Sequence, residues 1–488
     1  MTRSLSVVVL GIGHVGLVTV ATLASLGHQV VGFDVNPDVI AQVGAGDIHF
    51  YEPGLADLLQ EGVQAGHLRF SSDPADAIAG ADIAMICVGT PSEPAMNGED
   101  GLDLSMVKAA AQTVITHATQ PVVIVEKSTV PPGTGDRIED LVALHGKGDL
   151  ITVASNPEFL REGQAVADTL RPDRIVVGAN DEHTHQVLAD LYAPQLAVHP
   201  SAYVATDRVT AEITKQASNA FLALKISFIN EVAALCEHVG ADITTVADGM
   251  GHDPRIGRAF LNAGIGYGGS CFPKDVSGLS AVYESHHLPE TTISGAHWVN
   301  EEAKRWPVKT LAKALWSIKG TTIAVLGASF KPHTDDIRES VAMYVVEQLL
   351  AQGAHVRLTD PVALPRVQAD TLLCDYGVID DQALAGAVVF DESDQDAENP
   401  GLGFLEPYVH QDNEQGKLEL VDTPQAAIEG ADAVLLATEW PEYAALNPDD
   451  IAQWLRTPVV VDGRIQWDGA AFEDAGLRFY QVGRRGRN

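Results

Sequence analysis

Cys271 lies in the part of this sequence whose residue types are best suited to covalent chemistry. Residues 266–275 read GYGGSCFPKD, so the thiol is followed within four residues by a cation, Lys274, and an acid, Asp275. A neighbouring cation lowers the pKa of a thiol, and glycine turns leave backbone N–H groups available to an oxyanion. A small buried cysteine in a turn is the alternative, and the flanking charges favour a nucleophile over it.

Two polar residues four positions apart, Lys215 and Asn219, lie within a long stretch that contains no proline or glycine. The apolar positions of residues 207–239 recur at helical spacing, which predicts a helix of about nine turns. On that helix both side chains project from one face, one turn apart. Polar pairs on helices are usually solvated, so the spacing alone favours an exposed pair over a catalytic one.

The segment NPEFLREG, residues 156–163, places two acids and an arginine around a phenylalanine and a leucine, after a proline. In isolation, a surface loop and a binding site explain this composition equally well.

Gly11, Gly13 and Gly16 form the pattern G-x-G-x-x-G directly after the apolar run 5–10. Such glycines permit a tight turn and a close approach of the backbone to a pyrophosphate at a helix N-terminus. Alone, the pattern also fits an ordinary glycine-rich loop. Asp34, at the end of the next apolar run, favours a dinucleotide, because its carboxylate would accept hydrogen bonds from the ribose hydroxyls and repel a 2′-phosphate. The sequence therefore predicts NAD rather than NADP.

The order of apolar and helical segments predicts two Rossmann-like halves. In the first half, strand-like runs alternate with helical stretches, which favours a parallel sheet. These runs are residues 5–10, 29–33, 83–88 and 122–126. The second half repeats the pattern at 321–326, 355–359 and 433–437, but it lacks the second and third glycines, so no second dinucleotide is expected. The predicted fold class is α/β, with two doubly wound parallel-sheet domains joined by a long central helix.

Length and composition exclude several classes of protein. The 488 residues suffice for roughly three domains, and 46% apolar with 20% charged residues is typical of a globular protein. The formal net charge of −35 disfavours binding to nucleic acid or to an anionic membrane surface. Four widely spaced cysteines predict neither a disulfide framework nor a zinc site, and they favour the cytoplasm. Glycines interrupt the apolar amino-terminal stretch, which argues against a signal peptide, and no segment is expected to span a bilayer.

Taken together, these motifs resemble the UDP-glucose/GDP-mannose dehydrogenase family over almost the whole chain. The matching segments, in order, are GIGHVG with FDVN, CVGTP, STVPPGTG, NPEFLREG, KQASN, DPRIGRAFLNAGIGYGGSCFPKD, SFKPHTDDIRES and VVVDGR. Residues 253–257 and 171–175 resemble the UDP-glucose branch more than the GDP-mannose branch. The UDP-N-acetylhexosamine branch differs around the cysteine, because it lacks the Phe-Pro-Lys-Asp continuation.

The resemblance implies a NAD-dependent four-electron oxidation, in which the primary alcohol at C6 of UDP-glucose becomes the acid of UDP-glucuronate while two NAD are reduced. Cys271 would hold the sugar first as a thiohemiacetal and then as a thioester, which water releases. The implied domains are 1–205 for NAD, 206–310 for dimerisation and the cysteine loop, and 311–488 for the UDP-sugar. The implied assembly is a homodimer or larger homo-oligomer with a shared active site.

Roles for single residues follow from the same resemblance. Lys215 and Asn219 would stabilise the charge that develops on oxygen, Asp275 and Thr129 would position water, and Glu158 would be the general base in thioester hydrolysis. The residues expected at the cofactor are Gly11, Gly13, His14, Val15, Gly16, Asp34, Thr90, Thr129, Glu162, Lys274 and Arg338. Those expected at the nucleotide sugar are Glu158, Phe159, Leu160, Arg161, Glu162, Lys215, Asn219, Arg255, Phe260, Tyr267, Gly268, Cys271, Phe272, Lys331 and Arg464. Arg255 would reach in from a neighbouring subunit, and no metal is expected.

Other functions stay open at this point. A GDP-mannose or UDP-hexosamine substrate would keep the mechanism, and a hydroxyacid-type dehydrogenase would need no thiol. A NAD-binding sensor that has lost catalysis would lack at least one of Cys271, Lys215, Asn219 and Asp275. Two departures from the family stand out: no basic residue occurs at 37–39, where the family often has one near the adenosine, and an acidic insertion is expected from Cys374 to Gly416.

Overall fold

The computed structural model describes residues 3–92, 101–373 and 416–485. The insertion expected from Cys374 onward lies outside the described residues up to position 415. The chain divides into two compact units. The N-terminal unit comprises Met1–Phe221 and Lys274–Glu290, and the C-terminal unit comprises Leu222–Pro273 and Thr291–Asn488.

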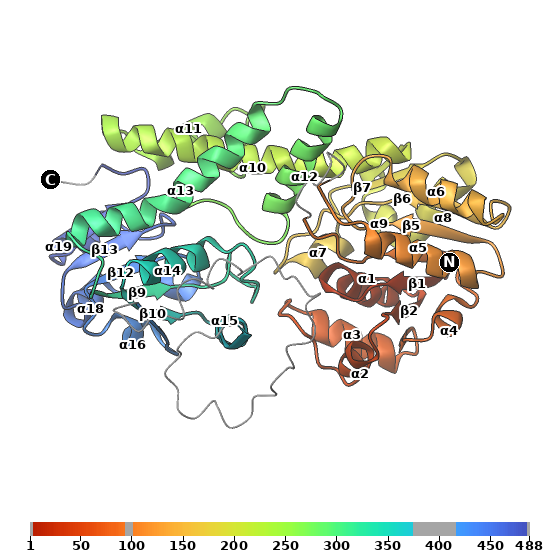
Figure 1. Cartoon of the computed structure of the whole chain (residues 1–488), viewed down its shortest axis with the longest axis horizontal. Helices are drawn as coiled ribbons and strands as arrows, with labels where there is room; N and C mark the ends of the chain where they lie inside the picture. Colours follow the sequence, from red (N-terminus) through yellow and green to blue (C-terminus); the bar gives the residue numbers. More distant parts are fainter. Residues whose placement is uncertain (1–2, 93–100, 374–415, 486–488) are drawn as a thin grey trace. The chain divides into compact units, whose positions relative to one another are not determined.

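The N-terminal unit is built on an eight-stranded sheet of order β3-β2-β1-β4-β5-β6-β7-β8. Figure 1 labels β1, β2, β5, β6 and β7 of this sheet. All neighbouring strands are parallel except β6 and β7, which are antiparallel. The strands are β1 (Ser6–Leu10), β2 (Gln29–Phe33), β3 (Leu68–Ser71), β4 (Ile83–Ile86), β5 (Val122–Glu126), β6 (Ile151–Ser155), β7 (Ile175–Ala179) and β8 (Tyr203–Thr206). The helices are α1 (His14–Ser25), α2 (Pro37–Gly44), α3 (Leu55–Gln64), α4 (Pro74–Ile78), α5 (Ser105–His117), α6 (Thr134–Leu144), α7 (Ala165–Leu170), α8 (Glu182–Leu191) and α9 (Ala193–Val198), with a 3₁₀ turn η1 (Pro200–Ala202).

The strand order brings together the loops that could hold a ligand. The chain begins at β1 in the middle of the sheet, adds β2 and β3 on one side, and then crosses to β4 on the other. In parallel sheets, ligands bind beyond the carboxyl ends of the strands at such a reversal. The loops after β1, β2, β4 and β5 therefore meet at one edge.

The C-terminal unit contains a six-stranded, all-parallel sheet of order β11-β10-β9-β12-β13-β14. Its strands are β9 (Thr322–Leu326), β10 (His355–Thr359), β11 (Lys417–Leu420), β12 (Ala433–Leu436), β13 (Val459–Asp462) and β14 (Arg478–Gln481). Its helices are α11 (Ile243–Gly251), α13 (Thr292–Leu315), α14 (Val341–Ala351), α15 (Leu364–Leu373), α16 (Pro424–Ile428), α17 (Pro441–Ala444), α18 (Pro448–Trp454) and α19 (Gly469–Asp474). Two helices carry residues of both units, α10 (Arg208–Val239) and α12 (Phe272–Ser285).

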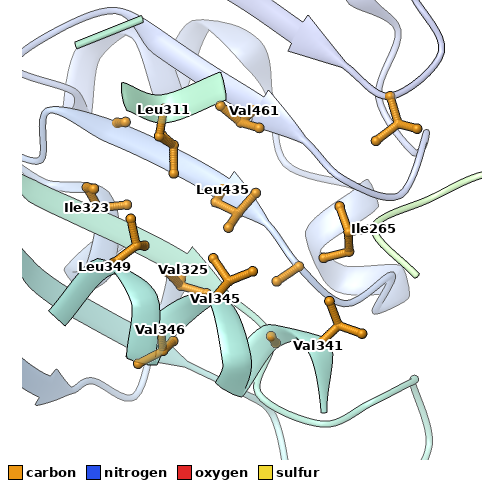
Figure 2. Packing of buried hydrophobic residues seen from close by; sticks show 14 of the residues in the cluster. Ile265, Leu311, Ile323, Val325, Val341, Val345, Val346, Leu349, Leu435 and Val461 are labelled. Carbon is orange, nitrogen blue, oxygen red and sulfur yellow. The ribbon is translucent and has the colours of Figure 1, made fainter. Parts of the chain in front are cut away.

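One face of the second sheet is covered by helices through a continuous aliphatic core. Val325 of β9, Leu435 of β12 and Val461 of β13 are fully buried against Leu311 of α13 and Val345 of α14, as Figure 2 shows. Branched side chains on a pleated strand pack well against helices, and parallel strands are usually buried on both faces. This explains why these strands read as continuous apolar runs.

The prediction of two parallel-sheet α/β domains with a long helix is confirmed. Helix α10 begins at Arg208 and ends at Val239, within one residue of the predicted span. The strand predicted at 83–88 ends earlier, at Ile86, because the backbone N–H groups of both Lys127 and Ser128 bond to the carbonyl of Ile86 and the pairing turns away there.

The prediction that no segment has the length and apolar character needed to span a bilayer is wrong for α10. By length and composition alone, this helix is apolar enough to cross a membrane. Three of its charged residues, Arg208, Glu212 and Lys215, are however buried among protein partners. Arg208 lies 2.6 Å from Asp136 and 2.5 Å from Glu139, and Glu212 accepts hydrogen bonds from the backbone at the start of α6. These contacts are those of a core helix.

Candidate active site

The three glycines of the turn after β1 occupy their positions for different physical reasons. Gly11 has φ +88°, and an added Cβ would lie 2.9 Å from Val88 Cγ1; a Cβ on Gly16 would lie 1.9 Å from the Gly11 carbonyl oxygen. Both positions therefore require glycine for packing. A Cβ on Gly13 would meet nothing within 4 Å. The open side of Gly13, at the N-terminus of α1, is where a pyrophosphate can approach the backbone N–H groups.

Asp34 follows β2 and holds this turn in place. Its Oδ2 accepts a hydrogen bond from the Ile12 N–H at 3.2 Å, and its Oδ1 accepts one from the Asn36 N–H at 3.0 Å. The carboxylate is half-buried beside the turn. It lies where a ribose would follow the pyrophosphate, and its charge disfavours a 2′-phosphate.

The second Rossmann-like half is closed at the equivalent place. Asp360, after β10, is buried and accepts hydrogen bonds from the N–H groups of Ala328 and Ser329 and from the indole N–H of Trp440. A Cβ on Gly327 would lie 2.3 Å from the side chain of Thr438. The side chains of Thr438 and Trp440 therefore pack against this turn, which lacks the second and third glycines.

Three residues expected at the cofactor meet beyond the ends of β4 and β5. The Thr90 hydroxyl donates to the Thr129 carbonyl at 2.8 Å, and Lys274 Nζ donates to Thr90 Oγ1 at 3.4 Å. Lys274 lies in the first turn of α12, so this helix is anchored to the edge of the sheet where the glycine turn lies. His14 and Val15 open α1 and are half-buried there.

Lys215 and Glu158 form a buried ion pair. Lys215 Nζ lies 2.7 Å from Glu158 Oε1, and the two side chains are 3% and 8% exposed. The Leu160 N–H donates to Glu158 Oε2 at 2.7 Å. Burial alone would raise the pKa of Glu158, but the charge and hydrogen bond of Lys215 and the Leu160 N–H together hold that pKa below its usual value. Glu158 is therefore a carboxylate at neutral pH.

One turn further along α10, Asn219 forms a second buried contact. Asn219 Nδ2 donates to Asp275 Oδ2 at 2.5 Å, and the other oxygen of Asp275 lies 3.2 Å from Lys274 Nζ. Asp275 is 1% exposed and Asn219 is 7% exposed. The face of α10 that carries Lys215 and Asn219, which the spacing alone did not assign to solvent or to catalysis, is thus buried. It presents an ammonium group and an amide group one turn apart. Such donors can stabilise an oxyanion in a water-poor site.

The loop that carries Glu158 is held at several points. The guanidinium of Arg174 lies 3.9 Å from the centre of the Phe159 ring, and Arg161 forms a bidentate pair with Asp168 at 2.6 and 2.9 Å. Leu160 is half-buried and Glu162 is buried. Phe159 was expected to frame the sugar, and in this structure one face of its ring is covered by Arg174.

Sequence reasoning missed a group of polar residues behind this site. Lys127 is buried, with its Nζ 3.5 Å from Asn156 Oδ1, and the Tyr192 hydroxyl donates to the same oxygen. Glu126, at the end of β5, is 1% exposed and its Oε1 has no hydrogen-bond partner. Burial, together with the charge of Glu212, raises the pKa of Glu126 well above its usual value. The only signal in the sequence was that three polar residues follow an apolar strand.

Cys271 directly precedes α12, whose first turn carries Lys274 and Asp275. It is half-buried, and its Sγ lies 3.7 Å from the Ser270 hydroxyl. The end of a helix where backbone N–H groups are exposed favours an anion. Cys87 and Cys236 are buried, and burial raises the pKa of the Cys87 thiol to about 12, so neither is suited to attack a carbonyl.

The loop before Cys271 is sterically fixed within the C-terminal unit. A Cβ on Gly268 would lie 2.0 Å from the carbonyl oxygen of Glu339. The rings of Phe260 and Tyr267 lie 6.2 and 5.9 Å from the ring of Phe272, and Tyr267 is buried. Three of the four aromatic residues expected at the nucleotide sugar thus form one cluster around the thiol loop.

The cations of the C-terminal unit that were expected at the ligands differ in their surroundings and in their exposure. Arg464 is 12% exposed and donates to the carbonyls of Ala437 at 2.7 Å and Gly266 at 3.3 Å, so it lies beside the loop of Cys271. Lys331 lies 5.0 Å from the Phe330 ring. Arg255 is 87% exposed and pairs with its near neighbour Asp253. Arg338 is 60% exposed and pairs with Asp336, and it directly precedes Glu339, whose carbonyl packs against Gly268 of this loop. Among the described residues no group of three or more His, Cys, Asp or Glu side chains is placed to hold a metal ion.

A glycine turn at the reversal point of a parallel sheet, an acid at the next strand end and buried lysine and asparagine side chains beside it define a NAD-dependent dehydrogenase. The comparisons with known proteins narrow this class. Family models for the UDP-glucose/GDP-mannose dehydrogenases match the NAD binding domain at residues 5–196, the central domain at 209–302 and the UDP binding domain at 324–390 and 396–469. The chain belongs to the UDP-glucose/GDP-mannose dehydrogenase family.

Individual relatives are similar over nearly their whole length. The chain is 38% identical over 479 residues to the UDP-glucose 6-dehydrogenase TuaD of Bacillus subtilis, covering 98% of this chain and 93% of that protein. It is 38% identical over 483 residues to the UDP-glucose 6-dehydrogenase of Rhizobium meliloti, covering 98% and 100%. A solved UDP-glucose dehydrogenase from the archaeon Pyrobaculum islandicum matches with a TM-score of 0.81 and 36% identity over 99% of both chains.

Proposed function

We propose that this protein oxidises UDP-glucose to UDP-glucuronate, with two NAD reduced for each sugar. Membership of the family and the full-length similarity to UDP-glucose 6-dehydrogenases support this substrate. When bound, NAD would supply the hydride acceptor for both oxidations. The chain must then supply a base, a stabiliser for the developing oxyanion and a nucleophile that keeps the aldehyde bound.

The observation that carries this proposal is the pair of buried contacts on one face of α10. Lys215 with Glu158, and Asn219 with Asp275, place two donors next to two acids, one helical turn apart. In the first step the alcohol gives its proton to a carboxylate of this polar group, and Lys215 and Asn219 stabilise the negative charge that develops on the oxygen. Loss of a hydride from the carbon then leaves a neutral aldehyde.

Cys271 takes the covalent role. Its thiolate adds to the C6 carbonyl and forms a C–S bond, which gives a thiohemiacetal whose oxygen again faces the two donors. Loss of a second hydride leaves a thioester. Water, positioned by Thr129 and Asp275, attacks the carbonyl carbon and transfers a proton to Glu158. The C–S bond then breaks and the thiolate is regenerated.

The lowered pKa of Glu158 is compatible with this last step. While Lys215 pairs with it, Glu158 is ionised but weakly basic. When Lys215 turns its charge toward the substrate oxygen, the buried carboxylate loses its partner and becomes a stronger base. Proton acceptance is thus favoured at the stage at which water attacks.

The assembly, the domain division and the location also belong to the proposal. We expect a homodimer or larger oligomer, because exposed apolar side chains recur every seven residues along α10 at Phe221, Phe228 and Leu235. The exposed Arg255 is available to a neighbouring subunit's site. Three domains at 1–205, 206–310 and 311–488, and a cytoplasmic location, remain predictions.

A panel of nucleotide sugars with NADH quantified against sugar consumed tests the function. UDP-glucose should be the preferred substrate and should give two NADH per sugar. Faster turnover of GDP-mannose or a UDP-N-acetylhexosamine would assign another substrate. A ratio of one, with free aldehyde accumulating, would exclude the covalent route.

A further inference from the structure

We propose that Glu52 is a positioning residue that connects the NAD-binding turn to the loop that carries Glu158. This inference rests on the proposed function, because it concerns how that site is assembled. The connection consists of one buried carboxylate that contacts both segments.

On one side, Glu52 holds the end of the loop 156–165. Its side chain is completely buried, its Oε2 accepts a hydrogen bond from the Gly163 N–H at 2.7 Å, and its Oε1 accepts one from the Ala165 N–H at 2.8 Å. Both oxygens are therefore used, and two backbone N–H groups that would otherwise be buried without acceptors are satisfied. Gly163 has φ +77°, so the loop turns sharply where Glu52 holds it.

On the other side, Glu52 faces the glycine turn. His14, between Gly13 and Gly16, places its buried Nε2 3.3 Å from Glu52 Oε2, a close contact that lacks the geometry of a hydrogen bond. The imidazole stacks on Phe50, with ring centres 4.2 Å apart and planes at 22°, and Phe50 lies in the same short segment as Glu52. The stacking on Phe50 therefore keeps Nε2 of His14 next to the carboxylate.

These contacts form a continuous path in the N-terminal unit. A pyrophosphate bound at the start of α1 restrains His14, and His14 restrains the carboxylate of Glu52. That carboxylate in turn sets the positions of Gly163 and Ala165, of which Gly163 directly follows Glu162 and lies five residues after Glu158. Coupling between two sites is reciprocal, so a nucleotide sugar bound at this loop should also strengthen NAD binding.

The loop has a second anchor that does not reach the glycine turn. Asp168 pairs with Arg161 and accepts a hydrogen bond from its backbone N–H at 3.0 Å. Glu52→Gln and Asp168→Asn are therefore matched changes: each neutralises one carboxylate that holds the same loop, but only Glu52 contacts His14.

The test measures NAD binding to the full-length protein without sugar, by calorimetry, and the NAD-induced protection of amides 156–165 from hydrogen exchange. His14→Phe keeps the stacked ring and removes the nitrogen, so it should abolish the protection and weaken NAD binding about 5-fold or more. Glu52→Gln should have the same two effects, and Asp168→Asn should leave the affinity for NAD unchanged. The His14→Phe/Glu52→Gln double variant should bind NAD no more weakly than either single variant.

Full protection in His14→Phe, or single effects that add in the double variant, would overturn the proposal. If Glu52→Gln does not fold, His14→Phe decides alone. A wrong substrate assignment would appear in the sugar panel and would leave these NAD measurements unchanged, so the two failures are distinguishable.

Discussion

Replacement of Lys215 by methionine should destabilise the N-terminal unit far more than loss of a surface charge. The substitution keeps the length of the side chain but leaves the carboxylate of Glu158 buried without its cation. Lys215 and Glu158 are 3% and 8% exposed and 2.7 Å apart, so little solvent screens them. Removing one partner of a buried pair costs about 3–5 kcal/mol, compared with about 0–1 kcal/mol for an exposed pair.

The Leu160 N–H still donates to Glu158 in the variant, which favours the lower end of that range. A loss of about 3 kcal/mol corresponds to a melting temperature roughly 6–12 °C lower for a unit of this size. The Lys215→Met/Glu158→Gln double variant should recover most of this loss, because no buried charge is left unpaired.

The loss of stability in Lys215→Met should also depend on pH. In the wild type the pKa of Glu158 is lowered, so its contribution to stability is present above the usual glutamate pKa of about 4.3 and is lost as pH falls through the lower folded value. In Lys215→Met, burial without the cation raises the pKa of Glu158. Protonation of Glu158 then removes the cost of burying an unpaired carboxylate. The deficit of the variant should therefore be largest near neutral pH and should shrink toward acid.

Urea denaturation followed by circular dichroism, at neutral and acid pH, measures this deficit. Lys225→Met is the matched control, because Lys225 lies on the same helix but donates only to the carbonyls of Ile256 and Gly257. A deficit no larger than that of the control, or one that does not change with pH, would refute the reasoning.

Three further results are expected. Glu126→Gln should gain stability relative to the wild type as pH rises above about 4.3, because the raised pKa makes the folded wild type hold a proton that the unfolded chain releases. The gain should reach at most about 1.4 kcal/mol per pH unit. Urea midpoints whose difference does not change with pH would contradict this. Asp34→Asn should reduce the ratio of kcat/KM with NAD to kcat/KM with NADP, because it removes the charge that repels a 2′-phosphate. The amide oxygen can still accept a hydrogen bond from the glycine turn. An unchanged ratio would show that Asp34 does not face the ribose. Gly268→Ala should lower the free energy of unfolding by about 1–3 kcal/mol and remove most of the activity. Its control is Gly249→Ala on α11, where a Cβ meets nothing within 4 Å, and this change should stabilise the protein slightly. Equal melting temperatures of the two variants would contradict the steric argument.

The sequence predicted the elements whose signals are local. The strand at β1, the glycine turn and Asp34 occur within 30 residues, and the apolar period of α10 extends over its whole length, so pattern alone was sufficient. The second half was recognised because β9, β10 and β12 repeat the order of β1, β2 and β4. The antiparallel pairing of β7 had no such signal, because strand direction depends on a tertiary connection.

The burial of the site residues could not be predicted from spacing. Lys215 finds Glu158 57 positions away, and Asn219 finds Asp275 56 positions away, so a helical period could not distinguish a solvated pair from a buried one. Glu52 lies 111 positions from Gly163, and nothing in its local sequence indicates that contact. The family resemblance identified Lys215 and Asn219 where spacing alone favoured exposure.

A covalent bond between Cys271 and C6 of the sugar is the central claim. Mass spectrometry of acid-quenched Glu158→Gln protein, after incubation with UDP-glucose and excess NAD, tests it most directly, because slow hydrolysis should let the thioester accumulate. The peptide that contains Cys271 should carry the mass of the UDP-glucuronyl group, and Cys271→Ala in the same background should carry none. An unmodified Cys271 peptide, in protein that has released two NADH per sugar, would contradict the account.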